Sequence, residues 1–170
     1  MPHEPPLIVT ALLDARAFAV LDGLRRRHFP AALNKVPAHV SLFHALPGAE
    51  IAAITATLDE IAARTAPIDL WPLAPVSLGR GVAFRYESEA LTRVHGELAR
   101  RWAGWLSPQD RQSFKPHVTI QNKVAPADAR ALLANLTPDA IPPCKVEGLG
   151  LWRYLGGPWE AVGESRLTGP

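Results

Sequence analysis

Two short stretches, FKPHVTIQ at residues 114–121 and PAHVSLFH at residues 37–44, decide how this sequence folds. Each contains a histidine that is followed by an apolar residue, a small hydroxyl residue and a second apolar residue. The chain has six histidines in 170 residues, so two of them in the same local frame indicate a repeated structural unit. The alternation of apolar and polar residues predicts a β-strand in each stretch.

Alternate side chains of a β-strand project to opposite faces, so each stretch presents a histidine and a hydroxyl residue on one face. His39 lies beside Ser41 in the first stretch, and His117 lies beside Thr119 in the second. The apolar residues between them point to the other face, towards a core. If the two faces pack towards each other, two imidazoles and two hydroxyl groups converge on one cleft.

The elements around the two stretches follow a similar order in each half of the chain. The first half is predicted to contain a strand at 7–13, a helix at 14–29 behind a cap at Asp14, a strand at 38–46 and a helix at 49–63. The second half is predicted to contain strands at 68–78 and 81–88, a helix at 88–106, a strand at 115–124, a helix at 126–133 and a hairpin of 146–155 with 158–167. The prolines in the 68–78 segment predict a sheet edge.

These elements predict an α+β fold. We expect a bilobal, pseudo-symmetric arrangement in which two helix-covered, antiparallel-rich sheets face a central cleft. The length allows one compact domain, so residues 1–170 are expected to form a single domain whose two sequence-repeated halves share that cleft.

The composition bounds the function. With 48% hydrophobic and 20% charged residues, the chain has the balance of a folded globular protein. The net charge of +2 comes without a dense Lys/Arg block, so any contact with nucleic acid should be local. The single cysteine, Cys144, excludes an internal disulfide and a multi-cysteine metal site. No apolar run has membrane-spanning length and no signal peptide pattern opens the chain, so we expect a cytoplasmic monomer with no membrane partner.

Two imidazoles facing each other suit the cleavage of a phosphodiester. In-line displacement at phosphorus needs a base for the attacking oxygen and an acid for the leaving oxygen, on opposite sides. Two nearby histidines resist being charged together, which favours one neutral and one protonated ring. The hydroxyl groups of Ser41 and Thr119 can donate hydrogen bonds to the non-bridging oxygens. This scheme needs neither a metal nor another cofactor, and neither motif has a further ligand at zinc spacing.

The sequences HVSL at 39–42 and HVTI at 117–120 resemble the paired His-x-Ser/Thr-x (HxTx) motifs of the two-histidine phosphoesterase superfamily. The similarity is to its 2′-5′ RNA ligase-like branch, also called RNA 2′,3′-cyclic phosphodiesterases. It implies a two-lobed enzyme that acts without metal on RNA ends or cyclic nucleotides. It implies catalytic roles for His39 and His117, and phosphate binding by Ser41 and Thr119.

The expected reaction is hydrolysis of a 2′,3′-cyclic phosphate to a 2′-phosphomonoester, with reverse 2′-5′ ligation possible in principle. Two alternatives stay open: a binding module for RNA ends or nucleotides that does not turn over, and a hydrolase of another small phosphoester. One departure concerns Asn122, which stands where many relatives of this branch have an arginine. Which histidine is the acid and which is the base is left open.

Other polar and aromatic residues are given structural roles. Strand alternation places His44 on the face opposite His39, and His3, His28 and His95 are expected at the surface in a tail or in helices. The arginines at 25–27 are expected on a solvated helix face. Lys115 has a positional claim to a phosphate contact. Phe84 and Tyr86 share one strand face and could stack a base, but aromatic residues in strands are more often packed. Tryptophans are assigned to packing by default: Trp71, Trp102, Trp105, Trp152 and Trp159.

Overall fold

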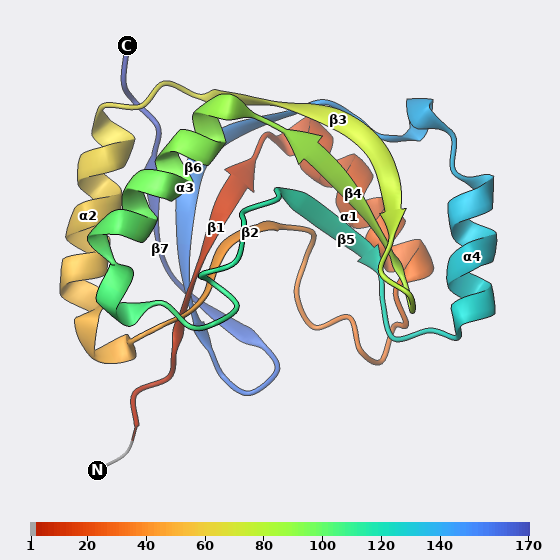
Figure 1. The fold of residues 1–170 in the computed structure, drawn as a ribbon, viewed down its shortest axis with the longest axis horizontal. Helices are drawn as coiled ribbons and strands as arrows, with labels where there is room; N and C mark the ends of the chain where they lie inside the picture. The colour runs from red at the N-terminus through yellow and green to blue at the C-terminus, as the bar shows by residue number, and fades with distance from the viewer. Residues whose placement is uncertain (1–2) are drawn as a thin grey trace.

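The computed structural model describes residues 3–170. Within that range the strands are β1 (Leu7–Leu13), β2 (Val40–Leu46), β3 (Ile68–Ser77), β4 (Val82–Glu87), β5 (His117–Gln121), β6 (Cys144–Tyr154) and β7 (Trp159–Arg166). The helices are α1 (Ala15–His28), α2 (Ile51–Ala63), α3 (Glu89–Arg101) and α4 (Pro126–Asn135). Each predicted strand and helix is present with bounds that shift by a few residues, and the α+β fold class is confirmed (Figure 1).

The strands pair antiparallel in the order β2-β1-β6-β3-β4-β5. Strand β7 pairs with residues 148–154 of β6, next to the segment 144–146 of β6 that pairs with β3. Strand β3 connects two sheet regions, one of β2, β1, β6 and β7 and the other of β4 and β5, which the sequence predicts as two sheets. Its residues 68–70 pair with β6, and its residues 71–77 pair with β4. The two sheet regions are therefore joined into one path, whose two end strands, β2 and β5, contain the two histidine motifs.

The predicted edge position of the 68–78 segment is wrong for the strand as a whole, because β3 lies between β6 and β4. The prolines nevertheless fall where a missing N–H is tolerated. Pro72 and Pro75 lie in the part of β3 that pairs with β4 alone among residues 3–170. A proline has no N–H to donate, so it is tolerated where β3 has a neighbouring strand on one side and not on both.

The first helix begins as the sequence predicts. The carboxylate of Asp14 accepts a hydrogen bond from the Ala17 N–H at 3.1 Å, which satisfies one of the free donors of the first turn. Its other oxygen accepts from the Lys145 N–H at 2.7 Å, so the cap also ties α1 to β6. The start of α1 is thereby fixed to the sheet that it covers.

The helices lie at different places around the bent sheet. Figure 1 shows α2 and α3 at one end and α4 at the other, and an ion pair between Glu60 and Arg101 at 2.6 Å links α2 to α3. Helix α1 packs against β5. In the part of the chain from residue 3 to 170, each helix is too short or too polar to cross a bilayer.

Arg25 joins α1 to the second histidine strand. The prediction of a solvated arginine face holds for Arg26 and Arg27, which are exposed, but is wrong for Arg25, which is buried. Its Nη1 donates to the carbonyl oxygen of Thr119 at 2.8 Å, and its guanidinium lies over the Phe29 ring. Burial lowers the pKa of Arg25, against the opposing effect of Asp22.

The core takes up residues that were candidates for other roles. Phe84 and Tyr86 are buried on the core face of β4, so the packing role expected for strand aromatics holds and the alternative that they stack a base is wrong. His95, expected at the surface, is buried between the rings of Phe43 and Phe114, with centroids at 4.7 and 4.1 Å and nearly parallel planes. The helical pattern placed it correctly on α3, but its neighbours come from distant segments.

Candidate active site

The two motif histidines lie at the beginnings of the two end strands of the sheet, one just before its strand and one as its first residue. His39 immediately precedes β2, and His117 is the first residue of β5. These strands are at opposite ends of the strand order, yet β2 and β5 contact each other because the sheet is bent. The bend therefore brings the two motifs to the same region of the molecule.

Each motif histidine is anchored in the same way. The Nδ1 of His39 lies 2.8 Å from the carbonyl oxygen of Pro37, and the Nδ1 of His117 lies 2.9 Å from that of Lys115. A carbonyl can only accept, so Nδ1 carries a proton in both rings and donates it to the residue two positions earlier. Nε2 is then the nitrogen that can exchange a proton with a ligand, because the hydrogen bond made by one ring nitrogen fixes the tautomer of the ring.

His39 favours its neutral form. Its ring is half-buried against the Trp159 indole, with centroids 4.6 Å apart. Burial, which disfavours the charged ring, lowers the pKa of His39 to about 4, even though the hydrogen bond to Pro37 acts in the opposite direction. The nearby charges of Arg25, His44 and His117 lower this pKa further.

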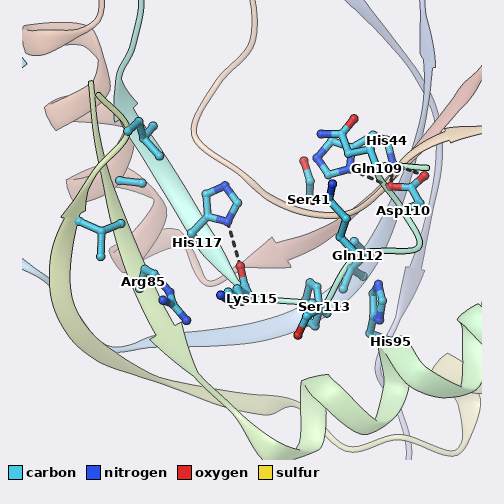
Figure 2. Close-up of a pocket in the computed structure, with 15 residues that line it drawn as sticks. Ser41, His44, Arg85, His95, Gln109, Asp110, Gln112, Ser113, Lys115 and His117 are labelled. Atoms are coloured by element: carbon cyan, nitrogen blue, oxygen red, sulfur yellow. Dashed lines mark hydrogen bonds and ion pairs between the residues drawn. The ribbon is translucent and has the colours of Figure 1, made fainter. Parts of the chain in front are cut away.

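A cavity of about 310 Å³ lies beside the second motif and is shown in Figure 2. His117, Arg85 and Lys115 are on one side of it, and Ser41, His44 and Asp110 are on the other. Its ionisable groups are therefore mostly basic, as an anionic ligand requires.

The structure distributes the four predicted site residues unequally. Ser41 and His117 line the same cavity. His39 lines a second cavity of about 370 Å³, and Thr119 lines neither of the two. Thr119 is half-buried on the strand face that also carries His117.

Arg85 is a basic residue of the site that the sequence argument missed. It pairs directly with His117 across β4 and β5, so both side chains project to the same face. Its Nε is buried and finds no hydrogen-bond partner among residues 3–170. Asn122, by contrast, uses its side-chain oxygen to accept from the Lys123 N–H. Position 122 therefore supplies no cation, and the guanidinium of Arg85 lies on the neighbouring strand β4.

His44 also differs from its prediction. Thr10 pairs with Ser41 and Val9 pairs with Phe43, so a β-bulge inserts one extra residue into β2. A bulge reverses the alternation beyond it. Leu42 and Phe43 are both buried, and His44 lines the same cavity as Ser41 instead of the opposite face.

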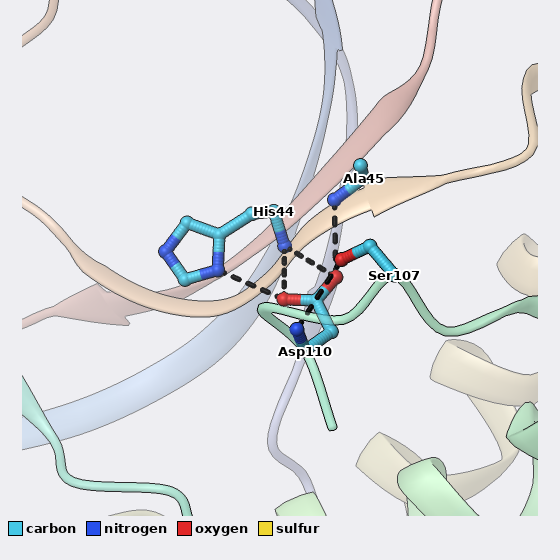
Figure 3. Close-up of polar contacts among 4 residues, drawn as sticks. All are labelled: His44, Ala45, Ser107 and Asp110. Carbon is cyan, nitrogen blue, oxygen red and sulfur yellow. Dashed lines mark hydrogen bonds and ion pairs between the residues drawn. The ribbon is translucent and has the colours of Figure 1, made fainter. Parts of the chain in front are cut away.

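Asp110 anchors His44, as Figure 3 shows. Its buried carboxylate accepts from the Nδ1 of His44 at 2.8 Å, and from the backbone N–H groups of His44 and Ala45 at 2.9 to 3.1 Å. Burial alone would raise the pKa of Asp110, but these hydrogen bonds outweigh it and lower the pKa. The ionised carboxylate ties the segment before the second motif to the strand of the first. The two residues are far apart in sequence, so no local pattern could have paired them.

For residues 3–170, the structure groups no three His, Cys, Asp or Glu side chains in a way that could hold a metal ion.

Comparison with known proteins finds a family that the sequence matches. A family model described as the 2′-5′ RNA ligase superfamily matches residues 13–158. No curated protein sequence matches the chain. Among solved structures, TT0787 of Thermus thermophilus is similar with a TM-score of 0.68 and 20% identity, over 96% of this chain and 98% of that one. LigT of E. coli, in a complex with 3′-AMP, is similar with a TM-score of 0.66 and 19% identity, over 97% and 99% of the two chains. At these identities the two structures establish the fold.

Proposed function

Because the chain belongs to the 2′-5′ RNA ligase superfamily, which supports a phosphoesterase- or ligase-type activity, we propose that it is a metal-independent cyclic phosphodiesterase. Its substrates are RNA ends or nucleotides with a 2′,3′-cyclic phosphate, and its product is a 2′-phosphomonoester. The protein acts as a cytoplasmic monomer whose two halves, within one domain, share the site.

The matched anchoring of the two histidines carries this proposal. In each motif a backbone carbonyl holds Nδ1–H, which leaves Nε2 of His39 and Nε2 of His117 for proton exchange. A binding protein would not need two rings held in one tautomer, whereas acid/base catalysis does.

In the proposed reaction, His39 is the base and His117 is the acid. Water attacks the phosphorus and loses a proton to Nε2 of His39, while the bond from phosphorus to the ribose O3′ breaks and His117 protonates O3′. The low pKa of His39 supports its neutral form at the start. A bound phosphate anion raises that pKa, because negative charge favours the protonated ring.

Charge that builds on the non-bridging oxygens is stabilised by donors from both motifs. Ser41 and Thr119 supply hydroxyl groups, as proposed for these positions from the resemblance. Arg85 supplies a guanidinium from the face that it shares with His117, and Lys115 adds a second positive charge at the cavity. Fixed donors directed at developing charge are the largest contribution to many such reactions.

The test is turnover of EDTA-treated protein on 2′,3′-cyclic nucleotides and on a short RNA with a cyclic-phosphate end. His39→Gln and His117→Gln should each lower kcat/KM by about 10²- to 10⁴-fold. His3→Gln, in the exposed N-terminal segment, is the matched control and should retain wild-type turnover. Absence of turnover on every substrate, with nucleotide binding retained in both variants, would identify a binding module instead.

A further inference from the structure

The cavity on the His39 side has a different chemistry from the cavity on the His117 side. It has a volume of about 370 Å³. Its walls are largely aromatic and aliphatic, and the residues that define them are Leu12, Phe18, Val36, His39, Trp152 and Trp159. We call these residues the aromatic pocket.

The two tryptophans of the aromatic pocket are held in place. The Trp152 indole N–H donates to the Thr10 hydroxyl at 2.9 Å. Trp159 lies against Trp152 with centroids 6.0 Å apart, and against His39 with centroids 4.6 Å apart. One wall of the pocket is therefore shared with a proposed catalytic ring, and both indoles are half-buried instead of filling the core.

Two glycines of β6 make room for this arrangement. A Cβ on Gly150 would stand 2.9 Å from a Leu12 methyl and 3.0 Å from the Thr10 hydroxyl oxygen. A Cβ on Gly148 would stand 3.2 Å from the other Leu12 methyl. The side chains of Leu12 and Trp152 can therefore lie close over the sheet, and any larger residue at these two positions would displace them.

The charged side chains of the pocket are exposed or half-buried and form its rim, whereas the Thr10 hydroxyl is buried. Arg166 forms ion pairs with Glu147 at 3.5 Å and with Glu164 at 3.9 Å, so its single positive charge offsets one of the two carboxylate charges. Lys35 is exposed at the same rim. Apolar aromatic walls with donors and acceptors at the mouth suit a flat aromatic ring that has a polar edge. The volume is at the lower end of small-molecule sites, about 300–1,000 Å³, which suits one nucleoside and not a longer strand.

We propose that the aromatic pocket is a nucleobase subsite, in which the base of the substrate packs against the indoles of Trp152 and Trp159. This inference rests on the proposed function, since His39 then joins the base-binding pocket to the phosphate site. The base lies on the His39 side, and the basic cavity with Arg85 and Lys115 takes the phosphate. Stacking on tryptophan discriminates little among bases, so the subsite accepts purines and pyrimidines with similar affinity.

Calorimetry with two probes tests the subsite. Adenosine 2′-monophosphate carries a base, and ribose 2-phosphate is its base-free counterpart. Wild-type protein should bind the first about 10- to 100-fold more tightly, as expected for stacking of one base. Trp159→Ala should abolish that preference and Trp159→Phe should retain part of it. Trp71→Ala is the matched control, because Trp71 is 60% exposed on β3 and lines neither cavity.

A second measurement, NMR of the tryptophan indoles, uses the wild-type protein and therefore does not require that a variant folds. In the wild-type protein, adenosine 2′-monophosphate should shift the indole N–H resonances of Trp152 and Trp159, and should leave those of Trp71 and Trp102 in place. Unchanged resonances of the first pair, or equal affinity for the two probes, would overturn the subsite.

Turnover separates this inference from the proposed function. If cyclic phosphates with and without a base are hydrolysed at equal kcat/KM, the function stands and the subsite is refuted. If no cyclic phosphate is hydrolysed, yet adenosine 2′-monophosphate is preferred and the preference is lost in Trp159→Ala, the subsite stands and the proposed function fails.

Discussion

The burial of His39 predicts a specific dependence of stability on pH. The pKa of His39 is about 4 in the folded protein, below the value of 6.5 expected for an exposed histidine. Between these two values the unfolded chain binds a proton that the folded protein does not bind. The free energy of unfolding therefore falls as pH falls from about 6.5 to about 4, and His39 causes no further change below that. The difference between the two pKa values corresponds to at most about 3 kcal/mol.

The variant His39→Gln isolates this effect. It removes the titrating group at similar volume, while every other ionisable group titrates in both proteins. Urea unfolding at intervals between about pH 7 and about pH 4 gives the free energy of unfolding of each protein. We expect the stability of wild type relative to the variant to decline by up to about 3 kcal/mol over this range. A difference that is constant with pH would refute the burial argument, and with it the reason for assigning His39 as the base.

Three further variants test other contacts. Arg85→Gln should lower kcat/KM by about 10²- to 10³-fold, because it removes a donor for the phosphate. It should not lower Tm, because the Nε of Arg85 has no hydrogen-bond partner in residues 3–170; a loss of stability with unchanged turnover would contradict this. Arg25→Met leaves the Thr119 carbonyl without its donor and should reduce the free energy of unfolding by about 1–3 kcal/mol in urea, whereas an unchanged value would show that the bond is dispensable. Asp110→Asn should reduce the free energy of unfolding by a similar amount, about 1–3 kcal/mol, and should lower kcat, because the segment before the second motif loses its charged hydrogen bond to His44. Unfolding followed by circular dichroism and a turnover assay measure the two effects; if neither changes, Asp110 does not anchor this segment.

Much of the fold could be predicted because its signals are local. The helical spacing of apolar residues predicted α2 and α3, and the capping aspartate predicted the start of α1. The alternation around His117 predicted β5, whose register shift against β4 lies beyond Thr119 and leaves the motif itself regular. These features depend on residues a few positions apart, which a sequence displays directly.

Features that depend on distant contacts could not be predicted in this way. The bulge in β2 reverses the direction of His44, and no residue type in that stretch announces it. Arg25 resembles its exposed neighbours in sequence, but it is buried because β5 packs against α1. The position of Arg85 opposite His117 follows from the register of β4 with β5, two strands that α3 separates in the sequence.

Trp159 is the most instructive case for the candidate site. A tryptophan beside a hairpin turn is usually a packing residue, and that was its assigned role. The structure instead places it against His39, where it explains the burial of that ring and forms a wall of the aromatic pocket. The hint in the sequence is that Gly148 and Gly150, two residues apart on one face of β6, leave space above this strand.

The central claim is that His39 and His117 act as one unit in cleaving a cyclic phosphodiester. The most direct test compares single-turnover rates on a 2′,3′-cyclic nucleotide for His39→Gln, His117→Gln and the double variant, all in EDTA. Groups that act together are strongly non-additive, so the double variant should lose about as much rate as either single variant. The two-histidine mechanism would be contradicted if the fold-loss of the double variant equalled the product of the two single fold-losses, or if either single variant kept the wild-type rate.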